Sequence, residues 1–322
     1  MDFAAPDLLR ELRGLLAGGR FREVLSRHHA AGAGASVPEA ALTAATAATR
    51  LGELETADLL AQDALGRFRT RVDEDGRMRS LNLLGAVAFE RGELALASQR
   101  FAGALAAARA LDDHQMTARA LNNLASVTHL RGDMEAALSL YREALLAYQQ
   151  MGDRRGSAET YHNLGLVHRE AGSLEEAERA GEHAVRHATL AGGAELLGLV
   201  LTGRAETALV GGDLLLADEA LGRAEALATE AEDPVGQAES RRIRAQLSLA
   251  RGHAAAALEH ALAARERSQA IGSRLLQAES AAVAARALDL LDRGDEAAGR
   301  RAEARQLFAA LGAVAHLKRL PN

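Results

Sequence analysis

The sequence repeats one pattern of small residues at a fixed interval of 40 residues. Six glycines stand at this interval: Gly52, Gly92, Gly132, Gly172, Gly212 and Gly252. Alanine stands five and twelve residues after each of them, and alanine or glycine stands seven residues before each of them. A unit of this length cannot bury its apolar face alone, so it must stack on copies of itself. The chain is therefore predicted to be an array of similar units.

Each unit reads as two helices joined by a tight turn. Alanine, leucine, arginine and glutamate, which favour helices, dominate the sequence, while aromatic residues make up only 3%. The repeated glycine is the residue type that ends a helix in a left-handed cap. Between units, Asp153, Asp233 and Ser273 are predicted N-caps, and Pro234 suits a first helical position. We expect an all-α protein in which small side chains bring neighbouring helices close together.

One segment carries a family resemblance. "LASVTHLRGDMEAALSLYREAL" has Ala125, Gly132, Ala137, Tyr141 and Ala144 at the spacing of the tetratricopeptide repeat, which it resembles. The interval of 40 residues is longer than the ~34 of the standard repeat. It is similar to the long-helix variant of Pins/LGN-type scaffolds and of the sensor arms of some bacterial regulators. The resemblance implies a right-handed superhelix, or α-solenoid.

The predicted organisation is one solenoid domain over residues 1–322, with about eight helix–turn–helix hairpins and a short C-terminal helix. Residues 1–35 form an atypical capping hairpin, because Gly19 stands only 33 residues before Gly52. Residues 36–272 hold six regular repeats, and residues 273–322 hold a divergent hairpin and a capping helix. Atypical end units commonly cap a solenoid.

Composition and charge narrow the function classes. The net charge of −6 disfavours a nucleic-acid partner, which requires a dense basic face. The absence of cysteine excludes disulfides and thiolate metal sites. We see neither a basic leader nor a run of ~18 apolar residues, so we expect no membrane insertion and a cytoplasmic location.

No catalytic or cofactor site is expected. The one lysine, Lys318, lies in the tail, so no P-loop is present. His183 and His187 are one helical turn apart, but no third metal ligand accompanies them. We expect no enzyme activity, no cofactor and no metal.

The first helix of each unit leaves one set of residues for the inner surface of the superhelix. Asparagine and histidine can bond the main chain of an extended peptide, and arginine can bind a carboxylate with two donors. In related scaffolds the asparagine of an N-L-G phrase contacts the ligand, which implies the same for Asn123 and Asn163. The predicted peptide-binding residues are Arg79, Asn82, Arg119, Asn122, Asn123, Ser126, His129, His162, Asn163, Arg169, Thr202, Leu209, Arg242, Gln246, Leu249 and Arg286. The alternative is that they solvate the surface or bond between adjacent first helices.

The function predicted from these features is a non-catalytic scaffold or adaptor that binds a peptide segment of another protein. Its partner is expected to be acidic with apolar anchors. Two alternatives stay open. One is a regulatory sensor that compacts around a short signalling peptide or small ligand. The other is a structural module that self-associates through the tail helix or through Leu215 and Leu216.

Overall fold

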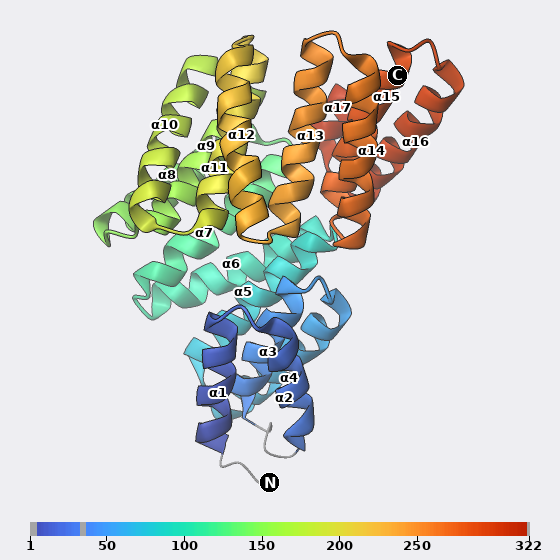
Figure 1. Cartoon of the computed structure of the whole chain (residues 1–322). Coiled ribbons are helices and arrows are strands. Elements are labelled where there is room, and N and C mark those ends of the chain that lie inside the picture. The colour runs from blue at the N-terminus through green and yellow to red at the C-terminus, as the bar shows by residue number, and fades with distance from the viewer. Residues whose placement is uncertain (1–4, 33–36, 321–322) are drawn as a thin grey trace. The chain divides into compact units, whose positions relative to one another are not determined.

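The computed structural model describes residues 5–32 and 37–320, and within these ranges the chain forms only helices. They are α1 (Ala5–Ala17), α2 (Phe21–Ala30), α3 (Pro38–Arg50), α4 (Leu54–Arg71), α5 (Glu74–Glu90), α6 (Leu94–Ala110), α7 (His114–Leu130), α8 (Met134–Gln150), α9 (Arg154–Glu170), α10 (Leu174–Ala191), α11 (Ala194–Gly211), α12 (Leu214–Glu230), α13 (Pro234–Ala250), α14 (Ala254–Ala270), α15 (Arg274–Asp289), α16 (Gly294–Leu311) and α17 (Val314–Arg319). Consecutive helices pair into eight hairpins and α17 follows the last, which confirms the predicted all-α solenoid (Figure 1).

The chain divides into two compact units, which are described separately. Unit 1 covers Met1–Val127 and unit 2 covers Thr128–Asn322, so the boundary falls inside α7. Unit 1 holds α1 to α6 and most of α7, and unit 2 holds the end of α7 and all later helices.

The repeated glycines and alanines have the turn conformation and the burial that their spacing predicts. All six turn glycines have a positive φ, between 73° and 89°. The alanines five residues after them, such as Ala137 and Ala217, are completely buried. At Gly85 the helices approach so closely that a Cβ atom would lie 2.6 Å from the ring of Phe101. Small side chains therefore set the distance between the two helices of this hairpin.

The breaks between hairpins also follow the 40-residue interval. Left-handed residues close the second helix at positions 72, 112, 152, 192, 232, 272 and 312. Asp153 and Asp233 cap the helices that follow, because their carboxylates accept a hydrogen bond from a backbone N–H of the first turn. Ser273 also stands at the predicted N-cap position, that of α15, but its hydroxyl makes no capping bond.

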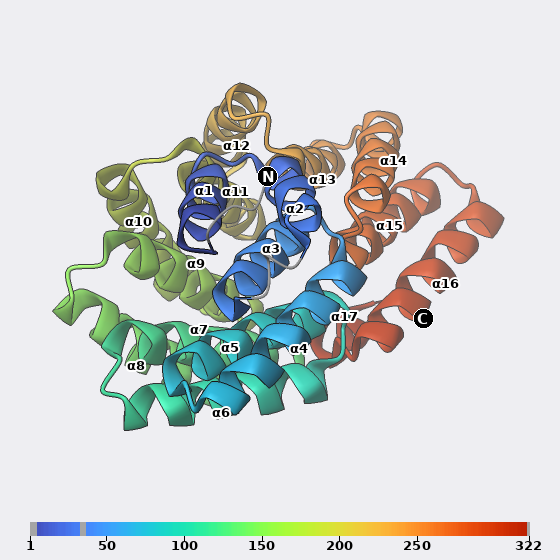
Figure 2. The ribbon, with the colours of Figure 1, turned by 90° about the horizontal axis from the view of Figure 1, so that it is seen from below.

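Within unit 2, the first helices of the hairpins lie on one side and the second helices on the other. Figure 2 shows α10, α12, α14 and α16 along the outer side and α9, α11, α13 and α15 along the inner side. None of the described helices combines the length and the apolar character needed to cross a membrane.

The tail helix covers the last hairpin. Leu317 and Leu320 pack against a buried cluster that includes Phe308 of α16.

At the turn into α12, Leu216 packs against a core cluster, whereas Leu215 is 82% exposed. Only Leu215 of this pair therefore offers an exposed apolar surface.

One break carries an unfavourable residue, which gives a test of the backbone geometry. Val72 has φ 55° and is 79% exposed, whereas Gly152 and Gly272 occupy the same place in later units. A β-branched residue in this conformation costs about 1 kcal/mol. We expect Val72→Gly to stabilise the chain by up to about that amount, measured by chemical denaturation. Val235→Gly, at an exposed position in α13, is the control and should destabilise. A loss of stability in Val72→Gly would contradict the left-handed cap.

Candidate functional site

In unit 1, the predicted inner-surface residues are joined by only a few polar contacts. Asn123 Nδ2 of α7 donates to Asn82 Oδ1 of α5 at 3.1 Å, which links two successive first helices. Arg79 is exposed and pairs at 2.9 Å with Asp75, one turn earlier on the same helix. Arg119 is exposed, and its guanidinium forms no hydrogen bond or ion pair with the described residues. It is therefore available to a ligand.

Two further predicted residues of α7 are half-buried and share a contact. Ser126 Oγ donates to the carbonyl oxygen of Asn122 at 3.2 Å, within the helix. This bond holds the serine hydroxyl against the backbone of its own helix.

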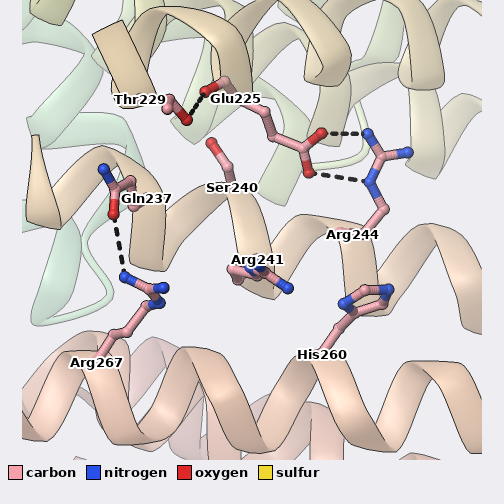
Figure 3. Close-up of a pocket in the computed structure, with 8 residues that line it drawn as sticks. All are labelled: Glu225, Thr229, Gln237, Ser240, Arg241, Arg244, His260 and Arg267. Carbon is pink, nitrogen blue, oxygen red and sulfur yellow. Dashed lines mark hydrogen bonds and ion pairs between the residues drawn. The ribbon is translucent and has the colours of Figure 1, made fainter. Parts of the chain in front are cut away.

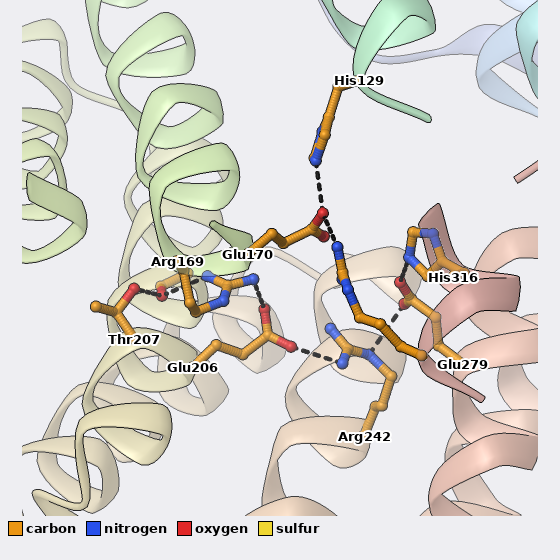
Figure 4. A network of polar contacts seen from close by, with 10 residues as sticks. His129, Arg169, Glu170, Glu206, Thr207, Arg242, Glu279 and His316 are labelled. Carbon is orange, nitrogen blue, oxygen red and sulfur yellow. Dashed lines mark hydrogen bonds and ion pairs between the residues drawn. The ribbon is translucent and has the colours of Figure 1, made fainter. Parts of the chain in front are cut away.

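In unit 2, five inner-face side chains form a continuous row of polar contacts across successive first helices (Figure 4). Arg169 Nη2 donates to Glu206 Oε2 at 2.7 Å, and Arg242 Nη1 donates to Glu206 Oε1 at 2.6 Å. Arg242 Nε lies 3.3 Å from Glu279 Oε2, and His316 Nε2 lies 3.1 Å from Glu279 Oε1. The row therefore runs from α9 through α11, α13 and α15 to α17.

The charged members of this row are mostly shielded from water and remain ionised. The side chain of Arg169 is 10% exposed and that of Arg242 is 8% exposed. Burial raises the pKa of Glu206, but Arg169 and Arg242 outweigh it and lower the pKa to about 2. Burial lowers the pKa of Arg242, and Glu206 and Glu279 raise it by more. Because the effect of the opposite charges on the pKa values exceeds that of burial, Glu206 and Arg242 are both charged at neutral pH.

A second set of contacts shares the same side of unit 2. His129 is buried, and its Nε2 lies 2.7 Å from Glu170 Oε2 at the end of α9. Arg319 of α17 donates to the same oxygen. Burial raises the pKa of Glu170, but its hydrogen bonds with Arg319 and His129 lower the pKa well below the usual range. The contact between Glu170 and Arg319 therefore joins residues 149 positions apart in the sequence.

His162 lies directly against the next first helix. A Cβ atom at Gly203 would stand 2.6 Å from Cε1 of the His162 ring, so the glycine makes room for the imidazole. Burial lowers the pKa of His162 to about 4, and the nearby Arg169 contributes. The ring is neutral at physiological pH and serves as a packing group.

Glu239 lies beside the row on α13, and its pKa is raised, whereas that of Glu206 is lowered. Burial raises its pKa to about 7, and the neighbouring carboxylates Glu206 and Glu279 add to this effect against the attraction of Arg242. The carboxyl is therefore half protonated near neutral pH.

The remaining predicted residues of unit 2 differ in accessibility. Thr202 is buried, and its hydroxyl donates to the carbonyl of Gly198 at 2.9 Å. Leu209 and Leu249 pack against core clusters. Asn163 and Gln246 are half-buried, and Arg286 is exposed.

The acidic partners in the row were not among the predicted site residues, although a signal for them exists. Arg169 and Glu206 are 37 residues apart, and Glu206 and Arg242 are 36 apart. Glu279 and His316 are again 37 apart. Opposite charges that recur slightly inside the repeat interval indicate pairing between successive first helices.

The two histidines considered for a metal have another role. His183 stacks on the ring of Tyr161 with centroids 4.8 Å apart, and His187 lies beside the same ring at 5.5 Å. In the part of the chain that the structure describes, no group of three or more metal-ligating side chains is found.

Because the pKa of Glu239 is raised, we expect Glu239→Gln to increase the stability of the chain by an amount that depends on pH. The ordinary pKa is 4.5 and the folded value is about 7, so the folded state holds a proton that the unfolded state releases between these values. Stability therefore falls as pH rises through this window. Glu239→Gln should stabilise the chain at pH 8, by roughly 3 kcal/mol at most, and have little effect at pH 5. Denaturation midpoints at both pH values measure this.

The exposed Glu259, changed to Gln, is the control and should shift neither midpoint. An equal effect of Glu239→Gln at both pH values would contradict the assignment.

Comparisons with known proteins agree with this architecture. The tetratricopeptide repeat family model matches residues 76–150 and 117–190. No curated protein matches the sequence. Among solved structures, a Rap protein complexed with competence and sporulation factor has a TM-score of 0.67 at 14% identity, over 98% of this chain and 96% of that one.

Two other solved structures are also similar. The Rap conjugation gene regulator of the plasmid pLS20, in complex with the Phr* peptide, has a TM-score of 0.70 at 14% identity, over 85% of this chain and 76% of that one. A tetratricopeptide repeat protein from Parabacteroides merdae ATCC 43184 has a TM-score of 0.51 at 17% identity, over 87% and 98%. At such identities the likeness establishes the fold alone. Residues 76–190 match the family model and the same helical hairpin recurs on both sides of them, so the chain contains tetratricopeptide repeats.

Proposed function

We propose that the chain is a non-catalytic scaffold whose inner helix faces bind a peptide segment of another protein. The observation that carries this proposal is the row from Arg169 to His316, whose side chains are held in place by one another on rigid helices. Side chains that are ordered before a ligand arrives add little ordering cost when it binds. A polar surface of this kind suits the main-chain amides of an extended segment.

The exposed cations define the chemistry of the segment. Arg169 and Arg242 are already neutralised by Glu206 and Glu279, so they are not the carboxylate-binding groups. Arg119 in unit 1 and Arg286 in unit 2 are exposed and form no ion pair with the described residues. We propose that each of them binds an acidic side chain of a partner.

Apolar anchors have a place beside these groups. Leu166 on α9 and Leu199 on α11 are half-buried and follow the same inner-face spacing as the charged row. Half-buried leucines can cover further apolar surface when a partner side chain packs on them. An acidic segment with apolar anchors fits this combination of leucines and exposed arginines.

The structural relatives are consistent with a peptide ligand. One Rap structure is a complex with the Phr* peptide, and another is complexed with competence and sporulation factor. Their identity of 14% transfers no binding residue to this chain. They support only the proposal that this fold accommodates a ligand of this kind.

A second candidate, a regulatory sensor, is favoured by the contact between Arg319 and Glu170. This contact joins α17 at the end of unit 2 to α9 near its beginning. A ligand that competes for Glu170 would release α17, and unit 2 would change shape. A scaffold would keep the contact in both states. Small-angle scattering with and without the bound partner distinguishes the two, because only the sensor changes its dimensions.

The exposed arginines give the test of the proposed function. We expect Arg119→Glu and Arg286→Glu each to weaken recovery of a protein partner from a lysate of the source cells, because each places a carboxylate opposite the partner's acidic groups. The recovered proteins are identified by mass spectrometry. Circular dichroism should show unchanged helix content, since both side chains are exposed.

Matched controls lie on the second helices of the same units. Arg69→Glu on α4 and Arg223→Glu on α12 change the charge equally at exposed positions and should leave recovery unchanged. Equal recovery with all four variants would rule out these inner faces as the binding surface.

A further inference from the structure

The outer part of unit 2 contains a cavity that the inner-face row does not use. It has a volume of about 530 Å³ and lies between α12, α13 and α14 (Figure 3). Its lining residues are Glu225, Thr229, Gln237, Ser240, Arg241, Arg244, His260 and Arg267. The volume falls within the ~300–1,000 Å³ that is typical of small-molecule sites.

The residues of α13 in this cavity occupy one face of the helix. Gln237, Ser240, Arg241 and Arg244 follow the spacing of three, four and seven that places side chains together. Arg242, which belongs to the inner-face row, points away from this face by the same geometry. The cavity is therefore a separate feature from the proposed peptide-binding surface.

The repeats provide an internal comparison for the charged residues of the cavity. At the position of Arg241, earlier units carry Leu81, Leu121, Tyr161 and Leu201. At the position of Glu225, they carry Leu65, Leu105, Leu145 and Val185. At the position of Arg244, the preceding unit carries Arg204 and the three units before it carry leucine. Polar groups thus replace the apolar packing that joins the helices elsewhere, and only this repeat combines all three changes.

Ser240 shows most clearly that the cavity is arranged for a ligand. It is 2% exposed, and its hydroxyl has no hydrogen-bond partner. The hydroxyls at the same repeat position, on Ser80, Thr160 and Ser280, each donate to the carbonyl four residues earlier, at 2.7–2.8 Å. A buried hydroxyl without a partner is costly, so a ligand atom is the expected partner.

The other donors of the cavity differ in how far they are already engaged. Arg244 donates to Glu225 at 2.6 and 3.0 Å and to Asp218 at 2.5 Å, so all three of its nitrogens are engaged. Arg267 donates to Gln237 at 3.0 Å through one nitrogen only. Arg241 forms no hydrogen bond or ion pair with any described residue. Two guanidinium groups therefore keep donors for an additional acceptor.

His260 completes the set of polar groups. Its Nδ1 is buried and has no hydrogen-bond partner. Burial lowers the pKa of His260, and the positive charge of Arg241 contributes to this. Glu225 in the lining and Asp218 beside it both pair with Arg244, and the charges of Arg241 and Arg267 are balanced by no carboxylate of the lining. A ligand with negatively charged oxygens would satisfy both the charge and the unpaired donors.

We propose that this cavity binds a small organic oxyanion, a phosphate ester or a carboxylate, through Arg241, Arg267 and the Ser240 hydroxyl. Guanidinium groups bind both kinds of anion with paired N–H donors. The volume leaves room for an organic body attached to the anionic group. The proposal does not depend on the peptide-binding function, because it concerns another face of α13.

Isothermal titration calorimetry on the full chain tests the proposal, with ribose 5-phosphate and citrate as separate probes at constant ionic strength. Saturable binding of either probe is the expected result, and the probe that binds tells whether the site takes phosphate esters or carboxylates. Arg241→Leu restores the residue of the earlier units and should weaken binding by roughly tenfold or more. Ser240→Ala should weaken it less.

The control is Arg223→Leu, which removes an equal charge from the exposed surface of α12 outside the cavity. It should leave the affinity unchanged. Failure of both probes to bind the wild-type chain would overturn the proposal. Equal affinities of the Arg241→Leu and wild-type chains would overturn it as well.

Discussion

Alanine and glycine at the repeated positions let neighbouring helices approach closely, and this close packing determines how the hairpins stack. Alanines such as Ala137, Ala177 and Ala217 are completely buried at every turn. Because these side chains are small, each helix packs near the backbone of the next, and the same hairpin can be stacked at a constant interval. Dispersion contacts and apolar burial over many such interfaces stabilise the array. Larger side chains at these positions would separate the helices and disrupt every contact that spans successive units.

The ordered row on the inner face of unit 2 is a consequence of this constant interval. Successive first helices bring residues 36 or 37 positions apart into contact, so Arg169, Glu206 and Arg242 can pair across three helices. A buried pair of charges contributes little net stability, since its attraction is offset by the loss of hydration. Its effect is to hold each side chain in one position. The outer face of α13 differs, because the side chains of Arg241 and Ser240 have no such partners among the described residues.

The fold could be predicted from the sequence because the same pattern of residues recurs in six units, so each unit supports the assignment of the others. The turn glycines and the buried alanines recur at one interval, and both keep the expected conformation or burial. The candidate site could be predicted only in outline. Helical spacing placed Arg169 and Arg242 on the inner face, but their carboxylate partners depend on the distance between helices, which the spacing along one helix does not contain. The cavity residues were not predicted. In the sequence, Arg241 and Arg244 look like charged residues on the surface of a helix, and only the packing of α12 and α14 shows that they line a cavity.

Hydrogen–deuterium exchange can show whether the inner faces of the first helices bind a polypeptide. The measurement compares the full chain alone with the chain bound to the protein recovered in the pull-down. Binding at the inner faces should slow amide exchange in α9, α11, α13 and α15 of unit 2 and leave exchange in the second helices α10, α12, α14 and α16 unchanged. Protection confined to the second helices would contradict it.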